Sequence, residues 1–170
     1  SKPKSVKHIR DKLNGKTLSC LELCHIMDDI SNDRLSAVEK AYFVSAGYLN
    51  GFTKREIVDM TKAMVVTGDQ LHFKQFTLDK HCIGGVPGNR TTMVVVPIVT
   101  AAGLHMPKTS SRAITSPAGT ADTMEVLARV ELCEKKVTKL MKKVKGFIIW
   151  GGTMNLAPAD DKIIEVEHPL

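Results

Sequence analysis

The chain has 170 residues, of which 43% are hydrophobic and 25% charged, a composition typical of a folded protein with one or two domains. Its apolar runs, at residues 93–99 and 147–150, are far shorter than the roughly 20 residues of a membrane-spanning helix, and its first residues are polar. We therefore expect a cytoplasmic protein without a membrane segment. The formal charge of +6 fits either nucleic acid or a small anionic substrate.

The first 70 residues predict a helical lobe. In the capping box S/T-x-x-E, a hydroxyl and a carboxylate satisfy backbone N–H groups at the start of a helix. The pattern occurs three times, at Ser19 with Glu22, at Ser36 with Glu39 and at Thr53 with Glu56. After the first box, apolar residues recur at helical spacing and predict a buried stripe that consists of Leu23, Ile26, Met27 and Ile30.

From Leu71 onward, short β-prone segments alternate with Gly- or Ser-rich loops and helical patterns, which is typical of α/β units. Strands are expected at residues 76–80, 104–109 and 147–150. Their loops would meet at the carboxyl edge of a parallel sheet, where such sheets bind ligands. Residues 91–102 favour a helix kinked at Pro97, although their valines also fit a strand.

The predicted fold class is α/β, with a small helical lobe at residues 1–70 followed by the beginning of a mixed α/β lobe with mainly parallel strands at residues 71–170. The helical lobe is a candidate for part of a dimer interface. Residues 159–166 favour a helix, after which the chain stops without a polar tail. We therefore expect the second lobe to be truncated at its C-terminus.

Lysines between residues 135 and 145 supply much of the positive charge. No aromatic residue interrupts them, whereas a surface that stacks nucleic-acid bases needs aromatic side chains. We interpret this run as a helix with a solvated face and expect no nucleic acid partner. The lysines concerned are Lys135, Lys136, Lys139, Lys142, Lys143 and Lys145.

The four cysteines show neither the paired spacing of a zinc ribbon nor the density of a disulfide scaffold, so we expect reduced thiols. Cys20 and Cys24 lie one helical turn apart beside His25, an arrangement that can hold a metal. No second pair of ligands follows at the usual spacing, and we therefore expect no metal site.

A first candidate anion site lies between Lys80 and the threonine pair Thr91 and Thr92. Glycines in residues 84–88 allow backbone N–H groups to face a ligand, and the threonines stand at a predicted helix start. The spacing fits neither the P-loop nor G-x-G-x-x-G, which disfavours an ATPase or a dehydrogenase. A tight connection between a strand and a helix would use the same glycines for geometry alone.

A second candidate lies at residues 109–122. Five Ser and Thr hydroxyls precede Gly119, Arg112 adds a positive charge, and Thr120 is expected to begin a helix. A turn rich in hydroxyls is often only a turn. Two such loops at the edge of one sheet, however, favour a protein that binds phosphate and catalyses its reactions.

These two loops carry a resemblance to a known family. Residues 80–92 and 110–125 closely resemble the thymidine phosphorylase superfamily, and GGVPGNRTT at 84–92 and SRAITSPAGTAD at 111–122 are similar to its archaeal AMP phosphorylase branch. The resemblance covers the whole chain. It implies phosphorolysis of a nucleotide or nucleoside in a homodimer or higher homo-oligomer, with inorganic phosphate as co-substrate and no metal or organic cofactor. AMP would give ribose 1,5-bisphosphate and free base.

The resemblance also implies roles for individual residues. Lys80, Ser110 and Thr120 would contact phosphate, beside the Thr91 and Thr92 of the first loop. Arg112 would be a bidentate phosphate clamp if its side chain points inward. His81 would orient the substrate or would be a buried structural histidine. The residues expected to contact the nucleotide are Gly85, Ser111, Arg112, Ala113, Ile114, Thr115, Ser116 and Thr120.

The chain departs from the family pattern in two ways. Cys82 stands where the family usually has serine, which replaces a good hydroxyl donor by a weak thiol donor. The acid that protonates the leaving base, and a lysine that binds the base, are expected beyond Leu170. Asp160 and Asp161 are interpreted as residues of a first helical turn after Pro158, not as that acid.

The sequence also allows several other functions. A pyrimidine nucleoside phosphorylase would use the same loops for a single phosphate. A phosphoribosyltransferase is disfavoured because no acidic pair near either loop suits a Mg²⁺-pyrophosphate complex. A basic nucleic-acid-binding module would bind with a steep dependence on salt and independently of Lys80. The chain could also be an inactive fragment that only folds and pairs.

Overall fold

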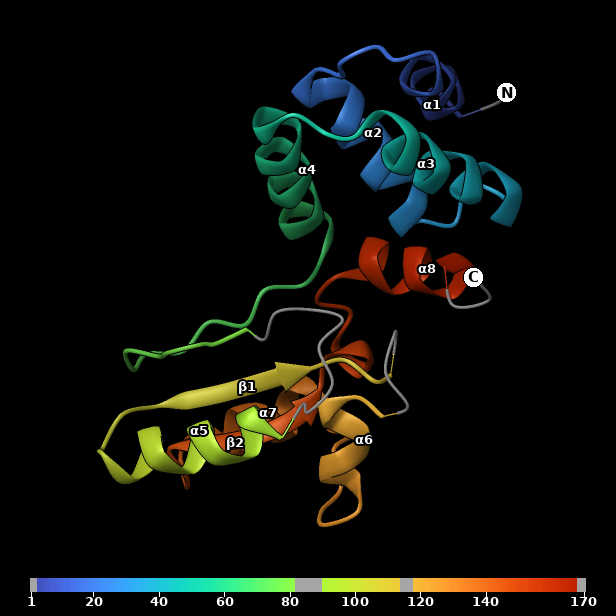
Figure 1. The fold of residues 1–170 in the computed structure, drawn as a ribbon. Coiled ribbons are helices and arrows are strands. Elements are labelled where there is room, and N and C mark those ends of the chain that lie inside the picture. Colours follow the sequence, from blue (N-terminus) through green and yellow to red (C-terminus); the bar gives the residue numbers. More distant parts are fainter. Residues whose placement is uncertain (1–2, 82–89, 114–117, 168–170) are drawn as a thin grey trace. The chain divides into compact units, whose positions relative to one another are not determined.

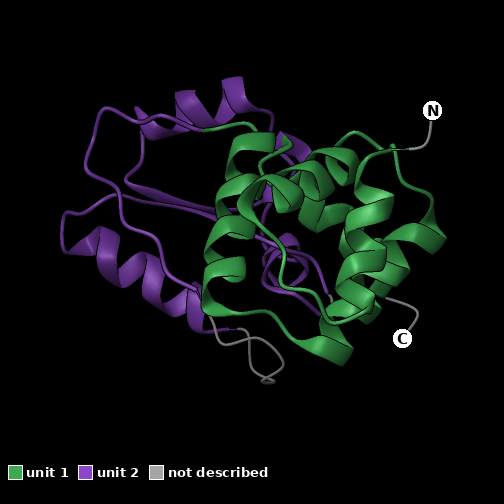
Figure 2. Cartoon of the chain, turned by 90° about the horizontal axis from the view of Figure 1, so that it is seen from above, with its two compact units in different colours: residues 1–70, 155–170 green, residues 71–154 purple. Residues whose placement is uncertain are grey.

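The structure is a computed structural model that describes residues 3–81, 90–113 and 118–167. It forms two compact units, one of Ser1–Gln70 with Asn155–Leu170 and one of Leu71–Met154 (Figure 2). Among the residues described, no helix is long and apolar enough to cross a membrane.

The described part of the first unit consists of helices and the turns and loops that connect them. The predicted helix starts are confirmed, since Ser19, Ser36 and Thr53 are N-caps whose side chains accept the backbone N–H of the glutamate three residues later. Each glutamate bonds back to the N-cap, which completes the capping box. The helices are α1 (Ser5–Leu13), α2 (Cys20–Ser31), α3 (Ala37–Asn50), α4 (Lys54–Thr67) and α8 (Pro158–Glu167) (Figure 1).

The core of this unit is built around α2. The predicted apolar stripe is confirmed, because Leu23, Ile26, Met27 and Ile30 are completely buried. A buried ion pair also ties α1 to α4, with Lys12 Nζ 2.8 Å from Glu56 Oε1. Such a pair must be fully hydrogen-bonded to offset its desolvation, and Glu56 accepts two backbone N–H groups as well.

Helix α8 belongs to the helical unit, although it follows the second unit in sequence. Ala159 is completely buried in the helical core, and Ile163 packs against that core. Lys162 Nζ donates to the backbone carbonyl of Ser31, 2.9 Å away at the end of α2. The structure therefore divides the chain differently from the expected 1–70 and 71–170, since the apolar face of α8 is buried against the first helices. The expected helix and the place of Asp160 and Asp161 in its first turn are confirmed.

The second unit contains a parallel pair of strands, as expected for an α/β lobe. Its register runs from Met106↔Gly146 to Ser110↔Trp150. The helix expected at residues 91–102 is present at Thr91–Ala101, with Pro97 inside it. The described elements are α5 (Thr91–Ala101), β1 (Met106–Ser110), α6 (Thr120–Glu125), α7 (Glu134–Met141), β2 (Gly146–Trp150) and the 3₁₀ helix η1 (Gly151–Met154) (Figure 1).

The prediction of a strand at residues 76–80 is wrong. The segment makes one parallel bridge, Thr77↔His105, and the N–H of Leu78 donates to the carbonyl of His105 at 2.8 Å. Phe76 is 76% exposed, so the segment lacks the apolar anchoring that would extend the pairing.

The lysine-rich run is helical only in its first part, because α7 ends at Met141 and Lys142, Lys143 and Lys145 follow it, but its predicted solvated face is confirmed. Val137 and Met141 are the buried residues of α7, whereas all six lysines of residues 135–145 are exposed. Separately, Cys20, Cys24 and Cys133 are free thiols, as expected for the cysteines that the structure describes.

Candidate functional site

The candidate site lies at the carboxyl ends of the two strands of the second unit. Ser110, which ends β1, pairs in register with Trp150, which ends β2. Open parallel sheets bind ligands at this edge. Four predicted site residues lie outside the described residues, namely Gly85, Ile114, Thr115 and Ser116, and so does Cys82.

The segment after β1 is attached to the start of α6 by Asp122. Its Oδ2 accepts the N–H of Gly119 at 2.9 Å and the N–H of Ala113 at 2.7 Å. The N–H of Ala121 donates to the carbonyl of Ser111 at 3.3 Å. These bonds fix residues 111–113 beside the buried Thr120, so the structure brings together the predicted residues of the second loop that it describes.

Gly119 is needed for this close approach. A Cβ atom at this position would lie 2.5 Å from the carbonyl carbon of Arg112 and 2.8 Å from the nitrogen of Ala113. Its φ of −79° is open to any residue, so the requirement is for space alone. Asp122 and Gly119 were not among the predicted site residues. The signal for Asp122 was its place three residues after the N-cap of α6, where a carboxylate caps backbone N–H groups.

Arg112 is held by carboxylates of the same unit. Its Nη1 is 2.9 Å from Asp122 and 2.7 Å from Glu125, and its Nη2 is 2.9 Å from Glu131. The guanidinium also lies 4.7 Å from the centre of the Trp150 ring. The hydrogen bonds that Arg112 donates to Glu125 and then to Asp122 raise the pKa of Arg112. In this structure the side chain joins the ends of both strands to α6, and its use as a phosphate clamp stays a prediction.

A cluster of charged side chains includes both sequence neighbours of Lys80. It consists of Asp79, His81 and Lys108. Lys108 of β1 is buried, and its Nζ is 2.9 Å from Oδ1 of Asp79. The other oxygen of Asp79 is 2.8 Å from Nε2 of His81. Burial alone would raise the pKa of Asp79, but the Lys108 ammonium and the backbone N–H of Lys80 hold that pKa below its usual value. Sequence reasoning missed Asp79 and Lys108, although a lysine inside an apolar strand pattern was a signal.

The remaining predicted residues differ in their surroundings. The side chain of His81 is 83% exposed, so the alternative of a buried structural histidine is wrong. At the start of α5, Thr91 is exposed while Thr92 is buried. The two hydroxyls therefore do not share one surface, and their contact with phosphate stays a prediction.

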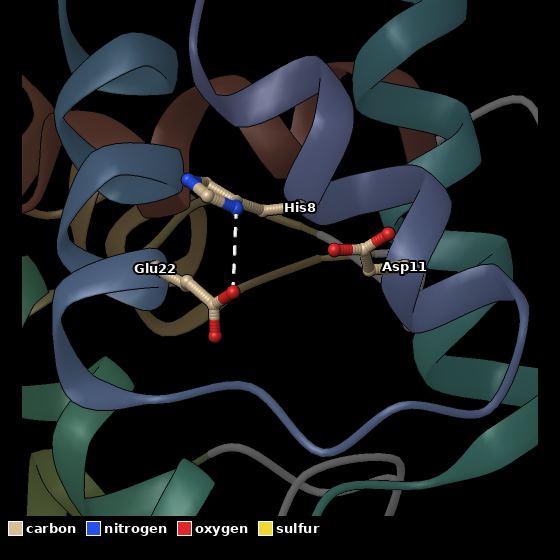
Figure 3. A group of neighbouring side chains, drawn as sticks. All are labelled: His8, Asp11 and Glu22. Carbon is tan, nitrogen blue, oxygen red and sulfur yellow. Dashed lines mark ion pairs between the residues drawn. The ribbon is translucent and has the colours of Figure 1, made fainter.

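A group of metal-ligating types lies in the helical unit, with ligand atoms of His8, Asp11 and Glu22 all within 4.8 Å of one another (Figure 3). Burial lowers the pKa of His8, and its Nδ1 is 3.5 Å from Glu22 Oε1. However, the Lys16 ammonium is 2.8 Å from Glu22 and 3.5 Å from Asp11. Since both carboxylates already have a cationic partner, we assign no metal to this group.

Comparison with curated proteins confirms the resemblance drawn from residues 80–92 and 110–125. The chain is 51% identical over 170 residues to the AMP phosphorylase of Methanococcus vannielii and 52% identical over 170 residues to AMP phosphorylase 1 of Archaeoglobus fulgidus. Each match covers 99% of this chain and 34% of the relative. A putative thymidine phosphorylase of Legionella pneumophila is 49% identical over 167 residues, which is 98% of this chain and 32% of that protein. The chain thus spans about a third of the length of these relatives.

A solved structure supports the fold. Anthranilate phosphoribosyltransferase from Thermus thermophilus matches with a TM-score of 0.72 over 93% of this chain and 49% of that chain, at 22% identity. At this identity the match confirms only the arrangement of a helical lobe followed by an α/β lobe.

Two family models cover nearly all of the chain. Residues 6–68 match the helical bundle domain of the glycosyl transferase family, and residues 74–168 match the a/b domain of the same family. The chain belongs to this glycosyl transferase family.

Proposed function

We propose that the chain forms the phosphate-binding part of a phosphorylase that cleaves AMP, and other nucleoside monophosphates, into free base and ribose 1,5-bisphosphate. The observation that carries the proposal is the identity of 51% and 52% to two archaeal AMP phosphorylases over 99% of the chain. As the chain spans about a third of these relatives, the proposal concerns the complete protein.

In the proposed reaction an oxygen of inorganic phosphate attacks C1′ of the ribose while the bond from C1′ to the base breaks. The phosphate is held in line by Lys80, Ser110 and Thr120, because charged and hydroxyl donors stabilise an anion. The positive charge that develops on the sugar needs that anion close by. The departing base takes a proton from an acid that we place beyond Leu170.

Residues 111–116 contact the nucleotide in this proposal. Support comes from the bonds of Asp122 to the N–H groups of Ala113 and Gly119, which fix the described part of that segment before any ligand binds. A segment held in this way loses little conformational freedom on binding.

A second candidate is phosphorolysis of thymidine to deoxyribose 1-phosphate and thymine. The match of 49% identity to a putative thymidine phosphorylase over 98% of the chain favours it. The two candidates differ in the phosphate group of the substrate and share the chemistry at C1′.

We further propose that the protein works in the cytoplasm as a homodimer or higher homo-oligomer. Inorganic phosphate is the co-substrate, and the reaction as proposed needs neither a metal ion nor an organic cofactor.

The test is the release of adenine from AMP by the complete protein, with and without inorganic phosphate, with thymidine as the comparison substrate. Release of adenine that depends on phosphate is the expected result. Release of thymine in its place assigns the nucleoside reaction, and release of neither base overturns both candidates.

A further inference from the structure

We propose that Lys108 and Asp79 act as a pair of positioning residues that set the distance between Lys80 and Ser110. This inference rests on the proposed function, in which Lys80 and Ser110 hold the attacking phosphate. Neither member of the pair is required to touch the substrate.

The two predicted phosphate residues lie on separate pieces of chain. Ser110 ends β1, whereas Lys80 lies on the segment that pairs with the residue directly before β1 through the bridge Thr77↔His105. After that bridge no further ladder pairing is present up to residue 81. Side-chain contacts therefore contribute to holding Lys80 relative to β1.

The contact between Lys108 and Asp79 lies at the required place. Asp79 directly precedes Lys80 in sequence, and its Oδ1 is 2.9 Å from Nζ of Lys108. Lys108 is two residues before Ser110 on the same strand, so their side chains leave the strand on the same face. The Asp79 carboxylate also lies 2.8 Å from Nε2 of His81 and accepts the backbone N–H of Lys80, so it contacts Lys80 and the residue that follows it in the chain.

The difference in burial between the two charged side chains explains why the pair holds a single geometry. The Lys108 side chain is 6% exposed and the Asp79 side chain 53% exposed. A buried ammonium needs its carboxylate partner far more than a half-exposed carboxylate needs the ammonium. Lys108 therefore holds Asp79 at one position, and through it the backbone of Lys80.

The experiment compares Lys108→Met, Asp79→Asn and the double variant in the complete protein. Each single variant is expected to weaken the binding of inorganic phosphate about 10-fold or more, measured by calorimetry and as KM for phosphate, while KM for the nucleotide changes less. Because the two residues act as a unit, the double variant should bind phosphate about as weakly as the single variant that binds it less tightly. Its loss of affinity should not equal the product of the two single losses.

Lys108→Arg keeps the charge and should restore most of the affinity for phosphate. Lys142→Met, which removes an exposed lysine of the same unit, should leave that affinity unchanged. Thermal unfolding of each variant separates a loss of folding from a loss of positioning.

Wild-type affinity for phosphate in both single variants, or additive effects in the double variant, overturns the inference. If the wild-type protein binds phosphate but releases no base, the proposed function fails, and the calorimetric comparison still decides the role of the pair. A wild-type protein that does not bind phosphate overturns both.

Discussion

At the scale of single residues, the structure buries several charged side chains. Glu56 is completely buried, and its carboxylate accepts bonds from Lys12 and from the backbone of Leu18 and Thr53. Burial raises its pKa, but these bonds outweigh burial and lower the pKa of Glu56 to about 2.

Replacement of Glu56 by Gln should lower the free energy of unfolding by roughly 3 kcal/mol, because it leaves the buried Lys12 ammonium beside a neutral partner. Urea unfolding of the chain measures this loss. Glu39→Gln is the matched control, since Glu39 holds the same place in a capping box that is open to solvent and glutamine can fill it. An equal loss in both variants would contradict the importance of the buried pair.

The stability that Glu56 contributes should also depend on pH. Its folded pKa of about 2 lies below the value of roughly 4.3 for an unfolded glutamate, so the contribution is full above about pH 4.3 and is lost as the pH falls towards 2. The difference in unfolding free energy between wild type and Glu56→Gln should therefore shrink below about pH 4. A constant difference down to pH 2 would show that the Glu56 pKa is not depressed.

At the scale of elements, the connection from β1 to α6 depends on close backbone packing. Gly119→Ala would place a methyl group 2.5 Å from the carbonyl carbon of Arg112, and a backbone neighbour cannot rotate away as a side chain can. We expect a loss of roughly 1–3 kcal/mol and faster hydrogen exchange at the Ala113 amide, which donates to Asp122. Ser111→Ala, a change at an exposed position of the same segment, serves as the control. Unchanged exchange at Ala113 in Gly119→Ala would refute the steric requirement.

How far the sequence predicts these elements depends on how local their causes are. Helix starts were predictable because a capping box involves residues three apart, and the structure contains all three boxes. Whether residues 76–80 form a strand could not be predicted in this way, because strand formation depends on a partner. The partner segment makes only one bridge, at His105.

The candidate site could be predicted only in part for the same physical cause. The two loops were visible as runs of Gly, Ser and Thr, but the contacts that position them join distant residues. Asp79 and Lys108 are 29 residues apart and Arg112 and Glu131 are 19 apart, and nothing in the local pattern pairs them. The direction of the Arg112 side chain depends on these distant carboxylates. The sequence alone does not tell whether the guanidinium binds the carboxylates or a substrate.

At the scale of the whole molecule, the proposed reaction assigns the stabilisation of charge to lysine and hydroxyl groups. Dialysis of the complete protein against EDTA should therefore leave the release of base from AMP in the presence of phosphate unchanged within about twofold, by comparison with the tenfold or larger effect of losing one charged contact. Rates before dialysis, after dialysis and after the return of Mg²⁺ or Zn²⁺ make the measurement. Activity that disappears and returns with a metal would refute the cofactor proposal.

The return of α8 to the helical unit has a consequence for how the chain is made. Ala159 and Ile163 complete the core that α1 to α4 begin, yet the ribosome supplies them only after all of residues 71–154 have been synthesised. The nascent helical unit therefore waits with part of its apolar surface uncovered while the intervening unit emerges, as happens when one domain is inserted into another. Final docking of α8 links the completion of the first unit to the synthesis of the second.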